Sequence, residues 1–150
     1  MKSEDDPVAE DESVIRLIWG EFLRPSQPVP IVTLSFRPRD DETDGISVYR
    51  LACLNDPREA RLAMTPEKRD RYAIAIIPVV ELIALGLSVA PSKNDLVPGH
   101  AVIPEMNIVA VKANRKYWKE IELKLVELAM RNLIPPVQMI WVQSVSKQDQ

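Results

Sequence analysis

The single histidine of the chain, His100, is the side chain best suited to acid–base chemistry. It precedes a short expected strand, and an imidazole can exchange a proton near neutral pH. Cys53, the single cysteine, could act with it as a thiol nucleophile and its base. However, Cys53 lies in an apolar run, without the glycine-rich or helix N-terminal setting that lowers a thiol pKa. The sequence therefore favours a structural histidine bonded to a backbone carbonyl and, more strongly, a buried thiol.

Three arginines, Arg37, Arg39 and Arg50, flank an acidic loop. The pair Tyr49-Arg50 on an expected strand resembles the strand arginine that holds a phosphate in NAD-consuming ADP-ribosyltransferase and RES-type toxin folds. The simpler alternative is a solvated hairpin whose arginines pair with nearby carboxylates, which requires no ligand. The candidate binding residues from these patterns are Arg37, Asp41, Tyr49, Arg50 and His100.

The sequence has no motif for a metal or a cofactor. Carboxylates in the acidic loop lack the EF-hand spacing, with its glycine and its final glutamate. A zinc site would need a cluster of cysteine and histidine, and the chain has one of each. No Walker loop, dinucleotide fingerprint or Gly-x-Ser-x-Gly motif occurs. We therefore expect no metal and no cofactor, and we assign no catalytic residue. The loop carboxylates are Asp40, Asp41, Glu42 and Asp44.

Periodicity and turn residues predict the elements that must position these side chains. Apolar spacing predicts a helix over 13–23, and alternation predicts strands at 31–37 and 46–51 that could pair as a hairpin. Asp56-Pro57 has the pattern of a helix N-terminus. The later elements expected are a strand at 72–77, a helix at 79–85 ended by Gly86, a strand at 100–103, and a helix at 115–132 capped by Asn114.

A chain of 150 residues with ordinary globular composition is long enough for one domain. We expect a compact α+β domain over residues 13–134, with a small, mostly antiparallel sheet and the long C-terminal helix packed on it. Residues 1–12 hold six carboxylates and one lysine, which is typical of a disordered acidic arm. Residues 135–150 begin with a double proline and are expected to be a tail or an edge strand, in which 137–142 could bind a partner.

Charge and hydropathy exclude several classes of partner. The chain has 19 basic and 22 acidic groups, of which one and six lie in residues 1–12, so residues 13–150 carry 18 and 16. This near-neutral body disfavours nucleic-acid binding. The longest near-apolar stretch, 72–90, is interrupted by Pro78, Glu81 and Gly86, so we expect no membrane span. A single cysteine and the lack of signal-peptide features predict a cytoplasmic protein, and the oligomeric state stays open.

Several segments, taken in order, resemble a family of small, uncharacterised bacterial proteins. The pattern has a Phe-Arg-Pro start, an acidic loop, an Ile-Ser-Val-Tyr strand and a closing Pro-x-His-Ala-x-Ile segment, over about residues 35–107. The resemblance implies a bacterial origin and that the matching residues lie together, but no particular activity. A role beside a larger effector, as in toxin–antitoxin or defence systems, would be typical of a family of this kind. The matching residues are Phe36, Arg37, Pro38, Asp41, Gly45, Ser47, Val48, Tyr49, Gly86, Leu87, His100, Ala101 and Ile103.

Two classes of function are compatible with the sequence. The near-neutral body, the acidic arm, the short apolar tail and the lack of a nucleophile–base–orienter set favour a non-enzymatic binding or accessory protein of a bacterial system, acting with a larger protein partner. The alternative is a small enzyme or toxin that acts on a nucleotide or NAD through His100, Arg37, Tyr49 and Arg50. Convergence of these four side chains on one cleft would favour the enzyme.

Overall fold

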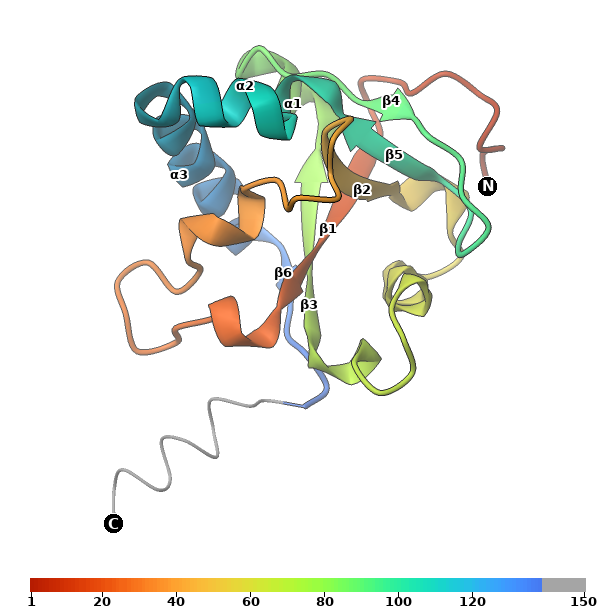
Figure 1. Cartoon of the computed structure of the whole chain (residues 1–150). Coiled ribbons are helices and arrows are strands. Elements are labelled where there is room, and N and C mark those ends of the chain that lie inside the picture. The colour runs from red at the N-terminus through yellow and green to blue at the C-terminus, as the bar shows by residue number, and fades with distance from the viewer. Residues whose placement is uncertain (139–150) are drawn as a thin grey trace.

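The computed structural model describes residues 1–138, which form one antiparallel sheet with helices packed on it (Figure 1). The strand order is β4-β5-β2-β1-β3-β6. This arrangement, with a long helix near the C-terminus, confirms the predicted α+β fold. The strands are β1 (Ser13–Trp19), β2 (Ile46–Arg50), β3 (Tyr72–Pro78), β4 (Ala90–Pro91), β5 (His100–Ile103) and β6 (Leu133–Ile134).

In the part of the chain that the structure describes, three α-helices and six short 3₁₀ segments connect the strands. Within residues 1–138, no helix is long and apolar enough to cross a membrane. The α-helices are α1 (Val79–Ala84), α2 (Ile108–Ala113) and α3 (Arg115–Arg131). The 3₁₀ segments are η1 (Gly20–Phe22), η2 (Thr33–Phe36), η3 (Leu51–Cys53), η4 (Pro57–Ala63), η5 (Arg69–Arg71) and η6 (Pro104–Met106).

Several predicted elements are confirmed. The strands at 72–77 and 100–103 correspond to β3 and β5, and the expected helices at 79–85 and 115–132 correspond to α1 and α3. Gly86 follows α1 with a positive φ of 81°, and the Asn114 side chain accepts a hydrogen bond from the Tyr117 N–H at the start of α3. Asp56 caps η4 through a reciprocal pair of hydrogen bonds with Glu59, although the segment is 3₁₀ rather than α-helical.

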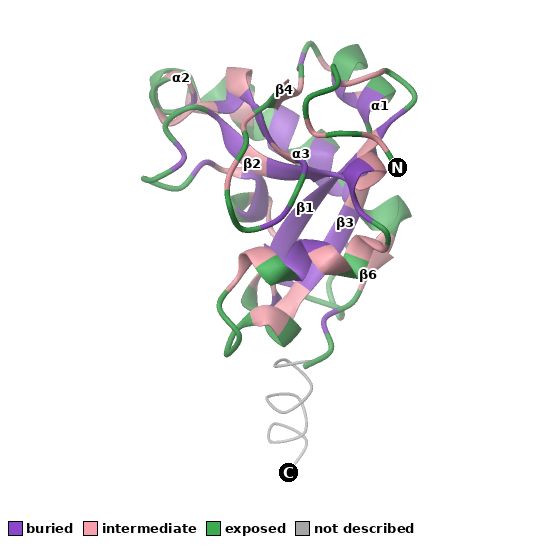
Figure 2. Cartoon of the chain, turned by 90° about the vertical axis from the view of Figure 1, so that its right-hand side faces the viewer, coloured by how far each residue is buried: buried purple, intermediate pink, exposed green. Residues whose placement is uncertain are grey.

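The helix predicted over 13–23 is wrong, because residues 13–19 form β1, a central strand of the sheet. β1 pairs along its whole length with β3, from Ser13 opposite Pro78 to Trp19 opposite Tyr72. Figure 2 shows both strands almost entirely buried. A strand covered on both faces has a continuous apolar run instead of a clear alternation. That run also satisfies a helical spacing, which is why the pattern indicated the wrong element.

The strand and hairpin predicted from 31–37 are also wrong. The segment contributes η2 instead, and β2 pairs with β1 and β5. In η2 the adjacent residues Ser35 and Phe36 are both buried, which a strand facing the core on one side would not allow. Contacts from elsewhere hold this turn, since the Arg16 guanidinium donates to the Ser35 carbonyl at 3.0 Å.

The two faces of the sheet support separate apolar clusters. One face packs against the three α-helices, and the other is covered by the chain around η3 and η4. Successive side chains of β1 point to opposite faces of the sheet. Val14 and Ile18 therefore pack on the side of the helices, and Ile15 and Leu17 pack on the other side. Residues of α3 that face the core are Ile121, Leu125, Val126, Leu128 and Ala129, with half-buried Trp118 against them.

The N-terminal segment packs on the sheet, in contrast to the disordered arm expected for residues 1–12. Arg50, which is 0% exposed, donates to both carboxylate oxygens of Glu12 at 2.9 Å. It also donates to the carbonyl oxygens of Asp6 at 2.7 Å and Pro7 at 3.2 Å. The Gly99 N–H donates to the Glu4 carboxylate at 3.1 Å. The acidic segment therefore neutralises and covers a buried arginine, which its composition alone did not indicate.

The C-terminal boundary placed at residue 134 also differs from the contacts of the described chain. Arg61 Nη2 donates to the Pro135 carbonyl at 2.9 Å, and the Gln138 N–H donates to the Asp70 carbonyl at 2.7 Å. Pro136 is buried. Residues up to 138 thus lie against the domain, while most of the segment 137–142 lies outside the described residues.

Gly45 is a position where an added methyl group is expected to be costly. Its φ is +132°, and a Cβ there would lie 2.2 Å from the Ile103 carbonyl oxygen. We expect Gly45→Ala to lower the free energy of unfolding by about 3 kcal/mol or more, because backbone strain adds to a clash with main-chain atoms. Gly86→Ala is the matched control, since its φ is +81° but no atom lies within 4 Å of the added carbon. It should lose only about 1–2 kcal/mol in urea unfolding, and equal losses would contradict the clash at Gly45.

Candidate functional site

A buried ion pair lies where β1 and β2 separate. The two strands share the pairs Val14–Arg50 and Ile15–Tyr49, so within residues 1–138 the second half of β1 has no strand partner on that side. Arg16 occupies the gap and donates to the Glu42 carboxylate and to the Ser47 carbonyl, both at 2.9 Å. The Ser47 N–H donates to the same carboxylate at 2.6 Å. The ion pair therefore satisfies backbone groups of β2 that a neighbouring strand would otherwise bind.

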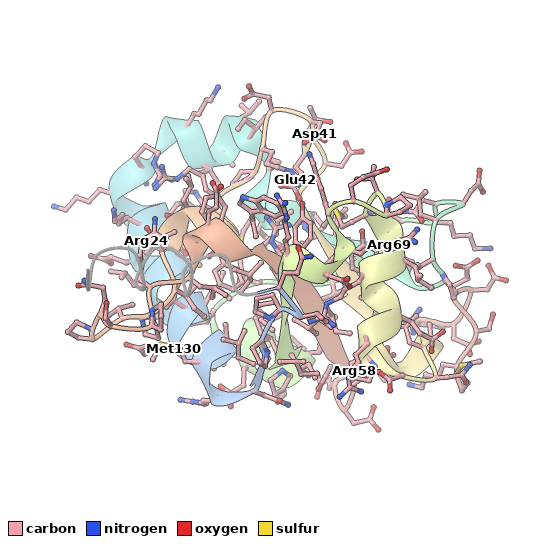
Figure 3. The ribbon with its side chains drawn as sticks, turned by 90° about the horizontal axis from the view of Figure 1, so that it is seen from below. Arg24, Asp41, Glu42, Arg58, Arg69 and Met130 are labelled. Atoms are coloured by element: carbon pink, nitrogen blue, oxygen red, sulfur yellow. The ribbon has the colours of Figure 1, made fainter. Side chains whose placement is uncertain are left out.

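Glu42 is held in its charged form by this arrangement. Burial alone would raise its pKa, but the charge and hydrogen bonds of Arg16, together with the N–H groups of Arg39 and Ser47, lower the pKa to about 2. The neighbouring Asp41 side chain is 78% exposed, and its one ion pair with the described residues is with Arg39, at 3.4 Å. Figure 3 shows Asp41 at the rim of the molecule and Glu42 further inward. One carboxylate of the acidic loop is therefore structural, and its neighbour is a surface group.

A cleft with a volume of about 470 Å³ lies beside this gap. Such a volume is within the usual range of small-molecule sites, roughly 300–1,000 Å³. Its wall combines four cationic side chains with aromatic and aliphatic ones, and in the described part of the chain no carboxylate belongs to it. The lining residues are Arg16, Leu17, Trp19, Phe22, Leu34, Ser35, Arg37, Pro38, Arg39, Lys68 and Tyr72.

Trp19 and Tyr72 form the aromatic part of the wall. They are register partners at the end of the β1–β3 ladder, and their ring centroids are 5.1 Å apart with an angle of 57° between the rings. Both side chains are half-buried, so each rests on the other and keeps part of its surface toward the cleft. Burial raises the pKa of the Tyr72 phenol, which keeps it neutral. The pair therefore offers an uncharged, planar surface for an apolar group of a ligand.

Arg37 links the cleft to α3. Its Nη2 donates to Glu122 at 3.3 Å, and Glu122 is 0% exposed and also receives two hydrogen bonds from Arg115, at 3.1 and 3.2 Å. Two arginines thus share one carboxylate. The Nε of Arg37 is buried and has no hydrogen-bond partner among the described residues. A buried donor without a partner is unfavourable, so Arg37 is only partly satisfied in this arrangement.

Arg39 and Lys68 supply the exposed charges of the cleft. The Arg39 side chain is 55% exposed, and its contacts with Asp41 and Glu42 are both at 3.4 Å. The pair with exposed Asp41 contributes about 0–1 kcal/mol, and the buried Glu42 has a shorter ion pair with Arg16, at 2.9 Å, so a ligand could displace these contacts of Arg39 at little cost. Lys68 is exposed and forms no ion pair with the residues that the structure describes. These two side chains are the freest cations in the wall.

The chain was compared with protein-family models, with curated proteins and with solved structures, and nothing matched. The resemblance to a bacterial family stays a prediction. Function has to be inferred from the geometry of the chain itself.

The candidate residues predicted from sequence are divided between different places. Arg37 lines the cleft, and Asp41 is not part of the lining but pairs with Arg39, which is. Tyr49 lines a small adjoining cavity with Arg16, Arg39 and Tyr72. Arg50 does not contribute, because its whole guanidinium is bound by Glu12 and by backbone carbonyls of the N-terminal segment.

His100 adopts the structural role that the sequence analysis favoured. Its ring lies 5.4 Å from that of Tyr49, and its Nδ1 is hydrogen-bonded to the Ser92 carbonyl. Because a carbonyl can only accept, Nδ1 carries the proton. His100 lies at the opposite end of the β2–β5 pair from the acidic loop. In the antiparallel β2–β5 pair Tyr49 is opposite His100, whereas Ile46, next to the loop, is opposite Ile103.

Cys53 is buried, and burial raises the pKa of its thiol. It packs under Gly99, where an added Cβ would lie 2.7 Å from the Cys53 Cβ. These features belong to a packed thiol and not to an activated nucleophile. Among residues 1–138, no cluster of His, Cys, Asp and Glu side chains could hold a metal ion.

Sequence reasoning missed most of the cleft. Trp19 and Tyr72 lie next to each other only because β1 pairs with β3, and a helix over 13–23 hid that pairing. Lys68 carried no sequence signal. Arg39 did, since Arg37-Pro38-Arg39 places two arginines two residues apart, and a residue pair with this spacing points to the same side in extended backbone.

Proposed function

We propose that the protein is a non-enzymatic binding protein whose site is the cleft beside Trp19 and Tyr72, and that its ligand is an anion with a planar apolar part. One observation carries the proposal. Four cationic and three aromatic side chains line a cavity of small-molecule size, and no described carboxylate shares the wall. Charges and rings of this kind favour a ligand that is both negative and flat.

The enzyme alternative receives less support from the same geometry. It relied on His100, Arg37, Tyr49 and Arg50 acting together. Arg50 is bound by Glu12, and His100 is bound by the Ser92 carbonyl. Of the four, Arg37 alone lines the cleft, and Tyr49 lines the small cavity beside it. A binding function does not need these four side chains to act together, so we rank it ahead of the enzyme.

The accessory role beside a larger bacterial effector protein is a further part of this proposal. Its support is the resemblance to a bacterial family described above. A ligand-binding protein of this kind could report the presence of an anion to its partner. Co-purification of the protein from a bacterial host, with and without the anion, would test that part.

Fluorescence of Trp19 provides the test of the binding site. Trp118→Phe and Trp141→Phe leave Trp19 as the single tryptophan of the three in the chain. The anionic, aromatic dye 1-anilinonaphthalene-8-sulfonate is the probe. We expect saturable quenching of Trp19, with an affinity that falls as salt is added, because the cations at the rim are solvated.

Two double variants with the same change of charge decide where the dye binds. Arg39→Gln with Lys68→Gln removes the free cations of the cleft and should weaken binding about tenfold or more, equivalent to about 1.4 kcal/mol. Arg58→Gln with Lys119→Gln removes one arginine and one lysine from exposed positions outside the cleft lining and should leave the affinity unchanged. Equal affinities for the two double variants would refute the cleft as the site.

A further inference from the structure

Resting on the proposed function, we infer that the ligand class is a nucleoside phosphate. The phosphate group would bind to Arg37, Arg39 and Lys68, and the base would lie on the ring surface of Trp19 and Tyr72. The inference follows from the charge balance of the cleft, the spacing of its arginines, the unsatisfied donor on Arg37 and the shape of the aromatic wall.

The charge balance favours a dianion. Five cationic side chains lie in and behind the cleft, and four of them pair with three carboxylates, which leaves an excess of two positive charges among these described residues. A phosphate monoester carries a charge of about −1.5 to −2 at neutral pH, whereas a carboxylate carries −1. A monoester would therefore balance the excess, and a carboxylate would leave about one charge uncompensated. The cations are Arg16, Arg37, Arg39, Lys68 and Arg115, and the carboxylates are Asp41, Glu42 and Glu122.

The arginine spacing favours an oxyanion with several acceptors. Arg37 has extended backbone angles, φ −86° and ψ 134°, and Pro38 fixes the next φ. Arg37 and Arg39 lie on either side of this proline and both line the cleft. A guanidinium offers parallel N–H donors that match phosphate oxygens two at a time. A proline between the two arginines reduces the conformational freedom lost when both bind one group.

Arg37 has unused donor capacity. Its Nε is buried and has no hydrogen-bond partner in the described part of the chain, and its contact with Glu122 is long, at 3.3 Å. Glu122 keeps two shorter hydrogen bonds from Arg115, so it stays neutralised if Arg37 turns away. A phosphate at the cleft would give the guanidinium of Arg37 the acceptors that it lacks.

The aromatic wall suits a base. Trp19 and Tyr72 expose part of their rings to the cleft beside Phe22 and Leu34, and the cationic side chains lie along the same cavity. Every nucleobase has a planar π-face that can stack on an aromatic side chain. A ligand that joined a flat ring to a phosphate would use both parts of the wall at once.

The test compares each part of the ligand with the whole. The probes are the common nucleoside 5′-monophosphates, the matching nucleosides and inorganic phosphate, measured with the Trp19 reporter protein and by calorimetry. We expect at least one nucleotide to bind ten times more tightly than both its nucleoside and inorganic phosphate, with quenching of Trp19. Arg39→Gln with Lys68→Gln should reduce the affinity for that nucleotide to that for its nucleoside, and Arg58→Gln with Lys119→Gln should not change it.

The outcomes separate this inference from the proposed function. Saturable binding of the anionic dye in the cleft without binding of any nucleotide would overturn the inference and leave the proposed function in place. No binding of either probe to a folded protein would overturn both. Nucleotide binding that is equally strong in the two double variants would also overturn the inference, because the phosphate would then lie elsewhere. Thermal melting of each variant shows that it is folded before it is titrated.

Discussion

Replacing Arg50 with methionine is expected to lower the free energy of unfolding by about 3–5 kcal/mol. The substitution removes the guanidinium donors of the buried Glu12 carboxylate and of the Glu4, Asp6 and Pro7 carbonyls. Among the described residues Glu12 then keeps only Lys2 and the Ala9 N–H as donors. Hydrogen bonds from Arg50, Lys2 and the Ala9 N–H outweigh burial and lower the pKa of Glu12 to about 2. Chemical unfolding at neutral pH measures the loss.

Two comparisons test whether the buried charge is the cause. Arg58 pairs with Asp56 at 3.1 Å on the surface, and Arg58→Met should cost less than about 1 kcal/mol. Arg50→Met combined with Glu12→Leu should lose less unfolding free energy than Arg50→Met alone, because no buried carboxylate is left without its arginine. A double variant that is less stable than the single one would contradict this explanation. Removal of residues 1–12 should be about as damaging as Arg50→Met. It breaks the same hydrogen bonds, because it removes the groups that accept them from Arg50.

Glu42→Gln is expected to lower the free energy of unfolding by about 2–4 kcal/mol. The amide can still accept a hydrogen bond from the Ser47 N–H, but it leaves the charge of Arg16 buried and uncompensated. Asp41→Asn, one residue away, is the matched control. It changes the same charge at an exposed position and should cost less than about 0.5 kcal/mol. Similar losses for the two variants would contradict the buried pair.

The same variant should change the dependence of stability on pH. Glu42 has a pKa of about 2 in the folded protein, against an ordinary value of 4.5. Its stabilising effect is complete above pH 4.5 and is lost as the pH falls toward 2, because the unfolded chain binds the proton first. A glutamine does not titrate, so unfolding free energies of Glu42→Gln should fall less steeply between these values. If the unfolding free energy of Glu42→Gln falls as steeply with pH as that of the parent, Glu42 is not the carboxylate that causes the loss of stability in acid.

The elements that sequence could predict are those whose local signals agree with their place in the fold. Helix α3 has a cap at Asn114 and one apolar face, and β3 is a short apolar strand that ends at Pro78, directly before α1. β1 fails this condition, because its burial on two faces comes from neighbours far away in the chain. Tertiary contacts likewise determine the conformation of η2, where Arg16 donates a hydrogen bond to the Ser35 carbonyl.

The candidate site was predictable only in part, for the same reason. Arg37 and Asp41 could be identified because arginines and carboxylates are crowded within a short stretch of sequence. Their actual partners could not be identified, since Glu122 is 85 residues from Arg37, and the Trp19–Tyr72 pair depends on strand register. Arg50 is a residue type that can bind a phosphate, but its guanidinium is paired with Glu12 of the N-terminal segment. Residue type predicts what a side chain can bind, and the fold decides what it does bind.

The central place of β1 also has a consequence for synthesis on the ribosome. β1 is the first strand of this chain to be made, yet its partners are β2 and β3, which are completed only at Arg50 and Pro78. Until then an apolar, β-branched segment is exposed, which invites association between nascent chains. Six carboxylates lie in the twelve residues before it. Charged residues that flank an aggregation-prone strand act as gatekeepers, so the segment that later covers Arg50 first keeps β1 apart from other copies of itself.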